Sequence, residues 1–304
     1  MEIFLILMEK LLLMFLFMLI GVVLFKKKII TEAGSESLAS LLIHLVLPCV
    51  ILNGFLVESS RERIYGLLIS IAVSAVSLGI SVLTARLCFK KDPIGHFAAA
   101  FSNPGFFGIP LILSVLGSEC IFYVAPFIAC LNILQWTYGV SVLKGEKTSV
   151  NLKKIVSSPF IISFLIGLVL FFTQLPLPEA AKSVIGTSAN LNTPIAMIVS
   201  GIYLAKADVK EMFLKPQFYK ISLVRLLIIP AVSGLVFCLI PAEFGDVRMS
   251  LFLAVACPVG SNVAVYAQLH KKNYIYAVQT VVLSTILSMI TIPLWVLLVQ
   301  RLWM

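Results

Sequence analysis

The segment SNPGFFGIP (102–110) places neutral polar side chains beside helix-breaking residues inside an otherwise apolar run. Ser102 and Asn103 directly precede Pro104 and Gly105. Proline removes a backbone donor and clashes with the preceding helical turn, so a continuous helix is not expected here. The predicted break leaves half-helix ends with exposed N–H groups and a partial positive charge, which attract anions and especially carboxylates.

A second break is predicted in ACPVGSN (256–262), where Pro258 is followed by Ser261 and Asn262. Unpaired backbone groups are costly in lipid, so the two breaks are expected to face and shield each other. Ser261 and Asn262 would then supply hydrogen-bonding groups beside the half-helix ends. The alternative is that the polar side chains of both segments only satisfy the opened backbone.

A third polar segment, TSANLNTP (187–194), ends at Pro194. Asn190 and Thr193 are three residues apart and would share one face of a continuous helix. They are candidates either for contact with a ligand in the pore or for hydrogen bonds between packed helices, and the sequence leaves both open.

Two ionisable side chains lie inside apolar runs. His44, four residues before Pro48, is a candidate for proton coupling because histidine titrates near neutral pH; the alternative is a hydrogen bond within the helix packing. Arg225 lies near the basic end of its run and is expected to extend its guanidinium to the membrane interface. The 14 acidic residues lie in loops or near the ends of runs, so the central carboxylate common in proton and cation carriers is not expected.

The elements that must position these residues are membrane helices. Of the 304 residues, 60% are hydrophobic and only 12% are charged, which is about half the charged fraction of soluble domains. The apolar residues form blocks of about 20 residues, each long enough to cross a bilayer as a helix. The ten predicted spans are residues 3–25, 37–57, 65–87, 94–117, 120–142, 157–174, 183–205, 219–240, 249–268 and 274–299.

Charge, cysteine content and motifs exclude several function classes. The net charge of +9 comes from loops that flank the spans, without an aromatic-interleaved basic stripe, so nucleic acid is not an expected partner. The six cysteines form no C-x-x-C pair, and neither a metal site nor a cofactor is predicted. No Ser/His/Asp set or H-E-x-x-H motif is present, so the protein is not expected to be an enzyme.

The loops predict the orientation of the chain. Most of the 23 lysines and arginines lie in the loops after spans 1, 3, 5, 7 and 9, which predicts that these loops are cytoplasmic and that both termini are outside. The longest connection, 144–156, is a predicted cytoplasmic linker between two five-helix sets, 1–143 and 157–304. Five is odd, so the sets have opposite orientation, as in an inverted repeat, and each set carries its break in its fourth span.

The stretch FSNPGFFGIPLILSVLG (101–117) resembles the N-x-G-F-x-G-x-P-L signature of the auxin efflux carrier family, which includes the plant PIN transporters. LVLPCVIL in span 2, ACPVGSNVAVYA in span 9, the basic turn after span 1 and the chain length are similar to the short prokaryotic branch of that family. The resemblance implies an all-α protein with two inverted five-helix repeats, broken helices 4 and 9 that cross at the membrane midplane, and an elevator-like transport domain on a scaffold. It also implies an organic-anion substrate whose carboxylate contacts Asn103 and Asn262, and a homodimer through the scaffold.

Together these features predict a multi-pass protein of the plasma membrane that moves a small organic anion, such as malate or an auxin-like acid, by alternating access. Its expected partners are that anion and the lipid bilayer. An anion channel and an anion sensor without transport are the alternatives that the sequence leaves open. The residues expected to contact the anion are Ser102, Asn103, Pro104, Gly105, Asn190, Thr193, Pro258, Ser261 and Asn262.

Overall fold

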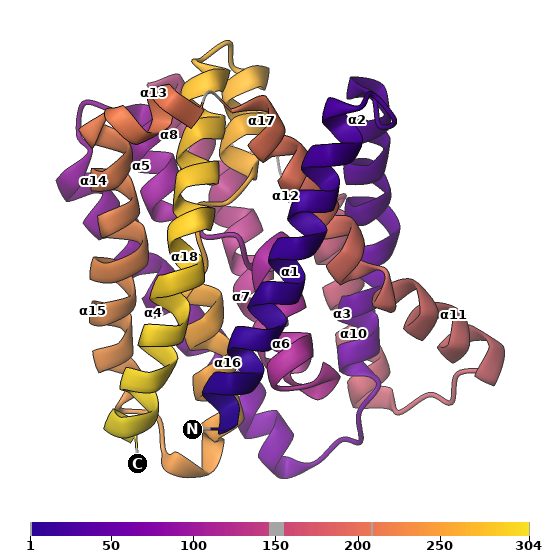
Figure 1. Ribbon diagram of the computed structural model, residues 1–304. Coiled ribbons are helices and arrows are strands. Elements are labelled where there is room, and N and C mark those ends of the chain that lie inside the picture. The colour runs from indigo at the N-terminus through magenta and orange to yellow at the C-terminus, as the bar shows by residue number, and fades with distance from the viewer. Residues whose placement is uncertain (1, 146–154, 208, 304) are drawn as a thin grey trace.

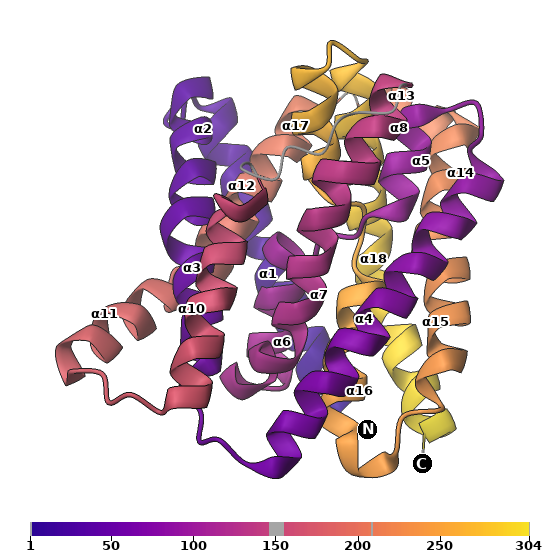
Figure 2. The same ribbon diagram turned by 180° about the vertical axis from the view of Figure 1, so that it is seen from behind.

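A computed structural model describes residues 2–145, 155–207 and 209–303, and these residues form a bundle of helices (Figures 1 and 2). The linker predicted at 144–156 lies mostly outside the described residues. The helices are α1 (Glu2–Lys26), α2 (Glu32–Leu41), α3 (Leu47–Phe55), α4 (Arg61–Cys88), α5 (Pro93–Ala100), α6 (Ile109–Val115), α7 (Ile121–Leu134), α8 (Val140–Lys144), α10 (Pro159–Thr173), α11 (Glu179–Asn190), α12 (Asn192–Lys206), α13 (Val209–Leu214), α14 (Pro216–Leu223), α15 (Ile229–Phe237), α16 (Gly245–Ala256), α17 (Asn262–Leu269) and α18 (Tyr274–Trp303).

The long helices of the protein are apolar, as in proteins that span a membrane. Within the described residues, six helical segments are long and apolar enough to cross a bilayer: 6–26, 32–55, 61–88, 118–144, 216–237 and 274–303. They coincide with predicted spans 1, 2, 3, 5, 8 and 10. The other predicted spans are shorter or interrupted. α10 has 15 residues, or about 22 Å of helix, and the remaining three are interrupted at 101–103, at Leu191 and at 257–261.

Two glycines set the distance between α1 and α12. A Cβ built on Gly21 would lie 2.3 Å from the backbone oxygen of Ile198, and one built on Gly201 would lie 2.0 Å from the backbone oxygen of Met18. The obstructing atoms belong to the backbone and cannot rotate away, so a larger residue would push the helices apart. Small residues are typical of helix contacts inside membranes because they allow this close approach.

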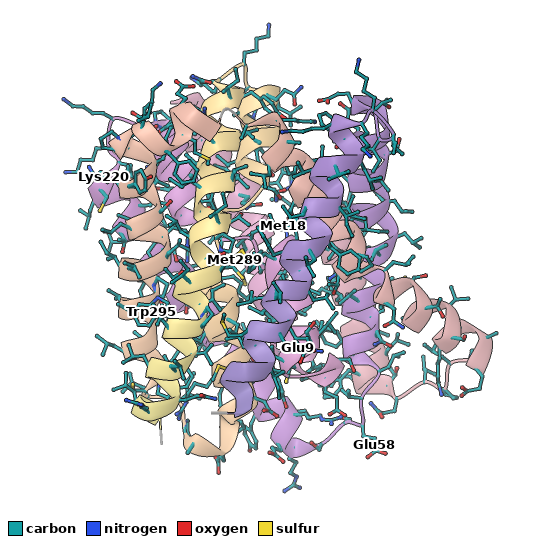
Figure 3. The ribbon with its side chains drawn as sticks, viewed as in Figure 1. Glu9, Met18, Glu58, Lys220, Met289 and Trp295 are labelled. Atoms are coloured by element: carbon teal, nitrogen blue, oxygen red, sulfur yellow. The ribbon has the colours of Figure 1, made fainter. Side chains whose placement is uncertain are left out.

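The two ends of the bundle carry different loops. The N-terminus of α1 and the C-terminus of α18 lie at one end (Figure 1), here called the terminal end. Glu58 also lies toward this end, whereas Lys220 lies toward the other (Figure 3). We call the second end the basic end, because its loops contain Lys26, Lys27, Lys28, Lys90, Lys91, Lys271 and Lys272.

Three helices contain a π-helical turn shortly before a proline. The turns are Leu42–Val46 before Pro48, Pro104–Gly108 before Pro110, and Val224–Ile228 before Pro230. Proline has no N–H, so the carbonyl four residues earlier lacks its helical partner. At Pro230 this is the Leu226 carbonyl, which accepts a hydrogen bond from the Trp295 indole at 2.7 Å. Such turns are frequent at functional sites, and the first two contribute to the site described next.

Candidate functional site

The two broken segments cross and pair through their backbones in a short antiparallel bridge. The Asn103 N–H donates to the Pro258 carbonyl, and the Gly260 N–H donates to the Phe101 carbonyl, both at 2.9 Å. Each break therefore satisfies backbone groups that the other leaves unpaired, as irregular backbone inside a membrane requires. The breaks meet as the sequence predicts.

Local sequence explains the geometry of this crossing. The Asn103 side-chain oxygen accepts a hydrogen bond from the Phe106 N–H at 3.3 Å and so caps the helical turn that follows. Gly260 approaches the first broken segment so closely that a Cβ built on Gly260 would lie 2.7 Å from the Ser102 carbonyl oxygen. Glycine at this position therefore allows the two backbones to pair.

A small cavity of about 30 Å³, here called the crossing cavity, lies where the segments meet. The side chains of Ile43, Phe160 and α7 complete its wall. A cavity needs roughly 10–15 Å³ to hold one water, so this one accommodates a group of two or three atoms. From the two breaks it is lined by Ser102, Asn103, Pro104, Gly105, Phe106, Gly260, Ser261 and Asn262. Thus, all predicted binding residues of the breaks line it except Pro258, which adjoins it through its bond to Asn103.

Several polar atoms at the crossing have no partner within the described residues. The Asn262 amide donates to the side-chain oxygen of Gln135 at 2.8 Å, while the Gln135 amide nitrogen and the Ser102 hydroxyl are buried and unpaired. The side-chain oxygen of Asn103 accepts the hydrogen bond that caps the following turn, so the side-chain nitrogen of Asn103 stays available as a donor. A buried unpaired polar group costs about 1–3 kcal/mol, and a ligand that bonds to these groups removes that cost.

Asn132 in α7 and Gln135 at the start of the π-helical turn that follows it (Gln135–Gly139) also belong to the site, although neither lies in one of the broken segments. Asn132 lines the crossing cavity and donates its amide to the Ile128 carbonyl at 2.9 Å. Gln135, one turn further on, holds Asn262. The sequence contains one signal for this pair: the two polar residues are three positions apart in an apolar span, which places them on one helix face.

Asn190 and Thr193 are not brought to the crossing cavity. α11 ends at Asn190, which is exposed, and extends away from the bundle (Figures 1 and 2). The helix is interrupted at Leu191, so the continuous helix expected for span 7 does not form. Asn192 is instead fully buried at the start of α12, and its amide group has no partner in the described part of the chain.

A second cavity, here called the vestibule, has a volume of about 370 Å³ and lies among α2, α12, α17 and α18 at the basic end. Ile43 lines both the vestibule and the crossing cavity, so its side chain lies between them. His44 is exposed in the vestibule wall, with Nδ1 2.9 Å from the Ser40 carbonyl oxygen. Glu32 and Lys206 also line the vestibule and form an ion pair at 2.7 Å.

Arg225 does not reach the membrane interface, and that prediction is wrong. The residue is 1% exposed. Its guanidinium donates to the Ala99 and Ala100 carbonyls at 3.1 and 3.3 Å, and to the Val255 carbonyl. These oxygens lie at the C-terminal ends of α5 and α16, where carbonyls lack helical partners and carry partial negative charge. The buried arginine binds them in place of water or lipid headgroups.

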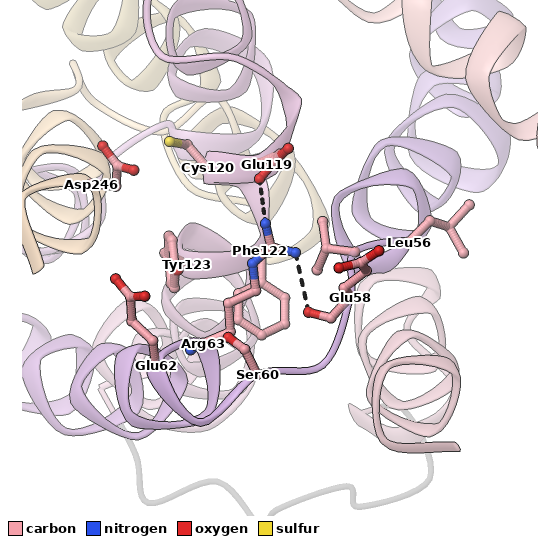
Figure 4. Close-up of a pocket in the computed structure, with 11 residues that line it drawn as sticks. Leu56, Glu58, Ser60, Glu62, Arg63, Glu119, Cys120, Phe122, Tyr123 and Asp246 are labelled. Atoms are coloured by element: carbon pink, nitrogen blue, oxygen red, sulfur yellow. Dashed lines mark hydrogen bonds and ion pairs between the residues drawn. The ribbon is translucent and has the colours of Figure 1, made fainter. Parts of the chain in front are cut away.

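Another cavity, of about 630 Å³, lies between the linker 56–60, α4 and the start of α7 (Figure 4). Its wall includes Glu58, which lies toward the terminal end (Figure 3). The Arg63 guanidinium pairs with Glu119 at 2.6 Å and donates to the Glu58 carbonyl at 3.2 Å. Within the described residues, its lining shares no member with the crossing cavity or the vestibule. Its several carboxylates disfavour an anion, so it is not part of the candidate site.

Residues 6–296 match a protein family whose description is "Membrane transport protein". The chain belongs to this family. The match confirms the resemblance seen in the sequence, and it assigns this membrane transport protein to a class whose activity is transport across a bilayer. An uncharacterized transporter of Methanothermobacter thermautotrophicus is 24% identical to it over 291 residues, which cover 91% of this chain and 93% of the relative.

Proposed function

We propose that this membrane transport protein is a secondary transporter that carries a small organic anion, such as malate or an auxin-like acid, across the plasma membrane by alternating access. The observation that carries the proposal is the pairing of two broken segments around a small polar cavity. Interrupted helices in corresponding positions of two halves of a chain are typical of transporter binding sites.

Electrostatics at the crossing favours an anion. The helical turns that begin at Pro104 and Asn262 start at the cavity wall, and the N-terminal end of a helix carries partial positive charge. The side chains beside them are neutral amides and hydroxyls, and no acidic side chain of the described residues lines the cavity. A carboxylate placed there would accept hydrogen bonds from the amide of Asn103 and the hydroxyl of Ser261.

The sizes of the two cavities support a division of the substrate between them. The crossing cavity, at about 30 Å³, has room for a carboxylate but not for a whole metabolite. The vestibule, at about 370 Å³, is within the range of small-molecule sites. We assign the carboxylate to the crossing and the rest of the substrate to the vestibule, with Ile43 displaced on binding. Asn190 and Thr193 have no part in this contact.

The packing of helices supports the ten-span inverted repeat, with halves 1–143 and 157–304 and the cytoplasmic linker between them. α1 packs on α12, and the pair that corresponds to it after exchange of the halves, α10 and α3, also packs together. The pairs α4–α7 and α14–α18 correspond in the same way. An elevator mechanism would divide the bundle into a scaffold of α1, α3, α10 and α12 and a moving domain that holds the crossing.

His44 is the residue that we propose for proton coupling. It lies in the vestibule wall, on the helix turn that also carries Ile43, and its side chain is exposed there. His44→Gln keeps a hydrogen-bonding side chain but does not titrate. The variant is expected to lose the part of the pH dependence of anion exchange that a protonatable side chain at this position supplies, and an unchanged pH profile would remove His44 from the mechanism.

Exchange of labelled carboxylates in proteoliposomes tests the proposed function. A carrier should show saturation and counterflow for at least one mono- or dicarboxylate. Asn103→Ser retains a side chain that caps helices but removes the amide, and it is expected to weaken anion binding about tenfold. Asn190→Ser, on the projecting helix, is the matched control. Equal exchange by both variants for every carboxylate tested would contradict the site assignment.

The same vesicles separate the alternatives. An anion channel would conduct without saturation or counterflow, and a sensor would bind carboxylates without flux. Membership of a transporter family favours transport over an enzymatic activity.

A further inference from the structure

The Arg225 guanidinium binds carbonyl oxygens from two half-helices at once. Nη1 lies 3.1 Å from the Ala99 oxygen and 3.3 Å from the Ala100 oxygen, both at the end of α5. Nη2 donates to the Val255 oxygen at the end of α16. α5 comes to the crossing from the basic end and α16 from the terminal end (Figures 1 and 2). Their C-terminal ends therefore converge on Arg225.

Helix ends, and not an acidic side chain, balance this buried charge. Within the described residues no carboxylate lies within ion-pair distance of Arg225. The C-terminal end of a helix carries about half a negative elementary charge, so two such ends together match one guanidinium. The residue is 1% exposed, and water contributes little to solvating it.

Half-helix C-terminal ends and unwound carbonyls are the groups with which secondary transporters coordinate sodium ions. In this chain a side chain already occupies them. We propose that Arg225 is a built-in counter-cation that takes the place of a bound alkali-metal ion at the crossing. The crossing then assembles, and its anion binds, without sodium. The planar guanidinium suits this position because its fork of donors reaches carbonyls on both half-helices, which the single ammonium of a lysine does not.

The wild-type protein provides the first test. Its thermal unfolding is measured in detergent, without organic anion, in sodium, potassium or N-methylglucamine chloride at constant ionic strength. The same Tm is expected in all three salts. A rise in Tm that is specific to millimolar sodium or potassium would overturn the proposal. Because no substrate is present, this result does not depend on the proposed function.

Chemical rescue provides the second test. Arg225→Ala removes the cation and leaves a space of its shape, so its Tm is expected to fall by about 5 °C or more. Millimolar guanidinium chloride should restore much of that loss, whereas urea, which is similar in shape but uncharged, should not. Arg225→Lys should lie between the wild type and Arg225→Ala. Arg63→Ala, which removes an arginine paired with an acid at the terminal end, is the control and should not respond to guanidinium.

Each outcome of the rescue bears on the proposal. If Arg225→Ala folds only when guanidinium is present during purification, the proposal is supported in its strongest form. If guanidinium and urea act alike, or if Arg225→Ala is as stable as the wild type, Arg225 is not the cation of the crossing. A third readout rests on the proposed function: anion exchange should continue when N-methylglucamine replaces sodium. Failure of exchange in every salt would count against the proposed function and would leave the two stability tests intact.

Discussion

Ser102 lies opposite Val259 in an antiparallel bridge, although the two residues belong to different halves of the chain. The Val259 N–H itself donates to a third element, the hydroxyl of Ser284 in α18, at 3.1 Å. Together with the two backbone hydrogen bonds beside the bridge, this contact fixes the crossing to its surroundings. If these hydrogen bonds persist during transport, α18 and both broken segments move as one unit, as in the proposed elevator.

The hydrogen bond between Gln135 and Asn262 positions an amide at the crossing cavity. Gln135→Leu removes it without adding bulk, and we expect anion binding to weaken five- to tenfold, or about 1–1.4 kcal/mol. Isothermal titration or a ligand-dependent shift in Tm measures the change. In a double-mutant cycle with Asn262→Ala, the two effects should be non-additive; full additivity would show that the contact does not contribute.

Ile43 separates the crossing cavity from the vestibule. Ile43→Trp should fill the passage and reduce anion exchange at least tenfold, because the larger ring leaves no room for the substrate. The matched control is Leu45→Trp, two residues further along the same turn, where the side chain is 42% exposed. Exchange at the wild-type rate by Ile43→Trp would mean that the substrate reaches the crossing by another route.

Contact between α1 and α12 depends on Gly201, where a Cβ would meet the Met18 backbone oxygen at 2.0 Å. Gly201→Val should lower the free energy of unfolding by about 1–3 kcal/mol through overpacking. Gly79 in α4 has no neighbouring atom within 4 Å of an added Cβ, so Gly79→Ala should stabilise the helix by about 0.5–1 kcal/mol. Thermal unfolding in detergent compares the two, and equal stability would argue against tight packing at Gly201.

The Leu226 carbonyl accepts a hydrogen bond from the Trp295 indole, which replaces the helical hydrogen bond that Pro230 cannot donate. Trp295→Phe keeps an aromatic ring against Phe252 but leaves that buried carbonyl unpaired, at a cost of about 1–3 kcal/mol. Adding Pro230→Ala restores a backbone N–H to the helix and should recover part of the loss. Stability of the single variant equal to that of the wild type would show that the carbonyl finds another partner.

The proline and glycine residues made the breaks predictable. Pro104 and Pro258, each followed within two residues by a glycine, disfavour regular helix in an apolar run, and neighbouring polar residues marked Asn103 and Asn262 as candidates. The family match confirms that the chain is a membrane transport protein, which is the class of protein assumed when these segments were interpreted. The same local reasoning failed at Leu191, where the helix is interrupted although no glycine is present. As a result, α11 projects from the bundle and Asn190 lies away from the crossing (Figure 1).

Residue types, order and hydropathy along this chain were enough to determine a multi-pass helical protein, its broken segments and its transporter family. Each of these follows from local chemistry or from spacing along the chain. The tertiary structure alone decided which atoms satisfy the opened backbone. It joined Asn103 to Pro258 and Gly260 to Phe101, placed Gln135 beside Asn262, and turned Arg225 inward to two helix ends instead of outward to the interface. These pairings depend on contacts between distant segments, and buried polar groups accept whichever partner the packing brings within hydrogen-bonding distance.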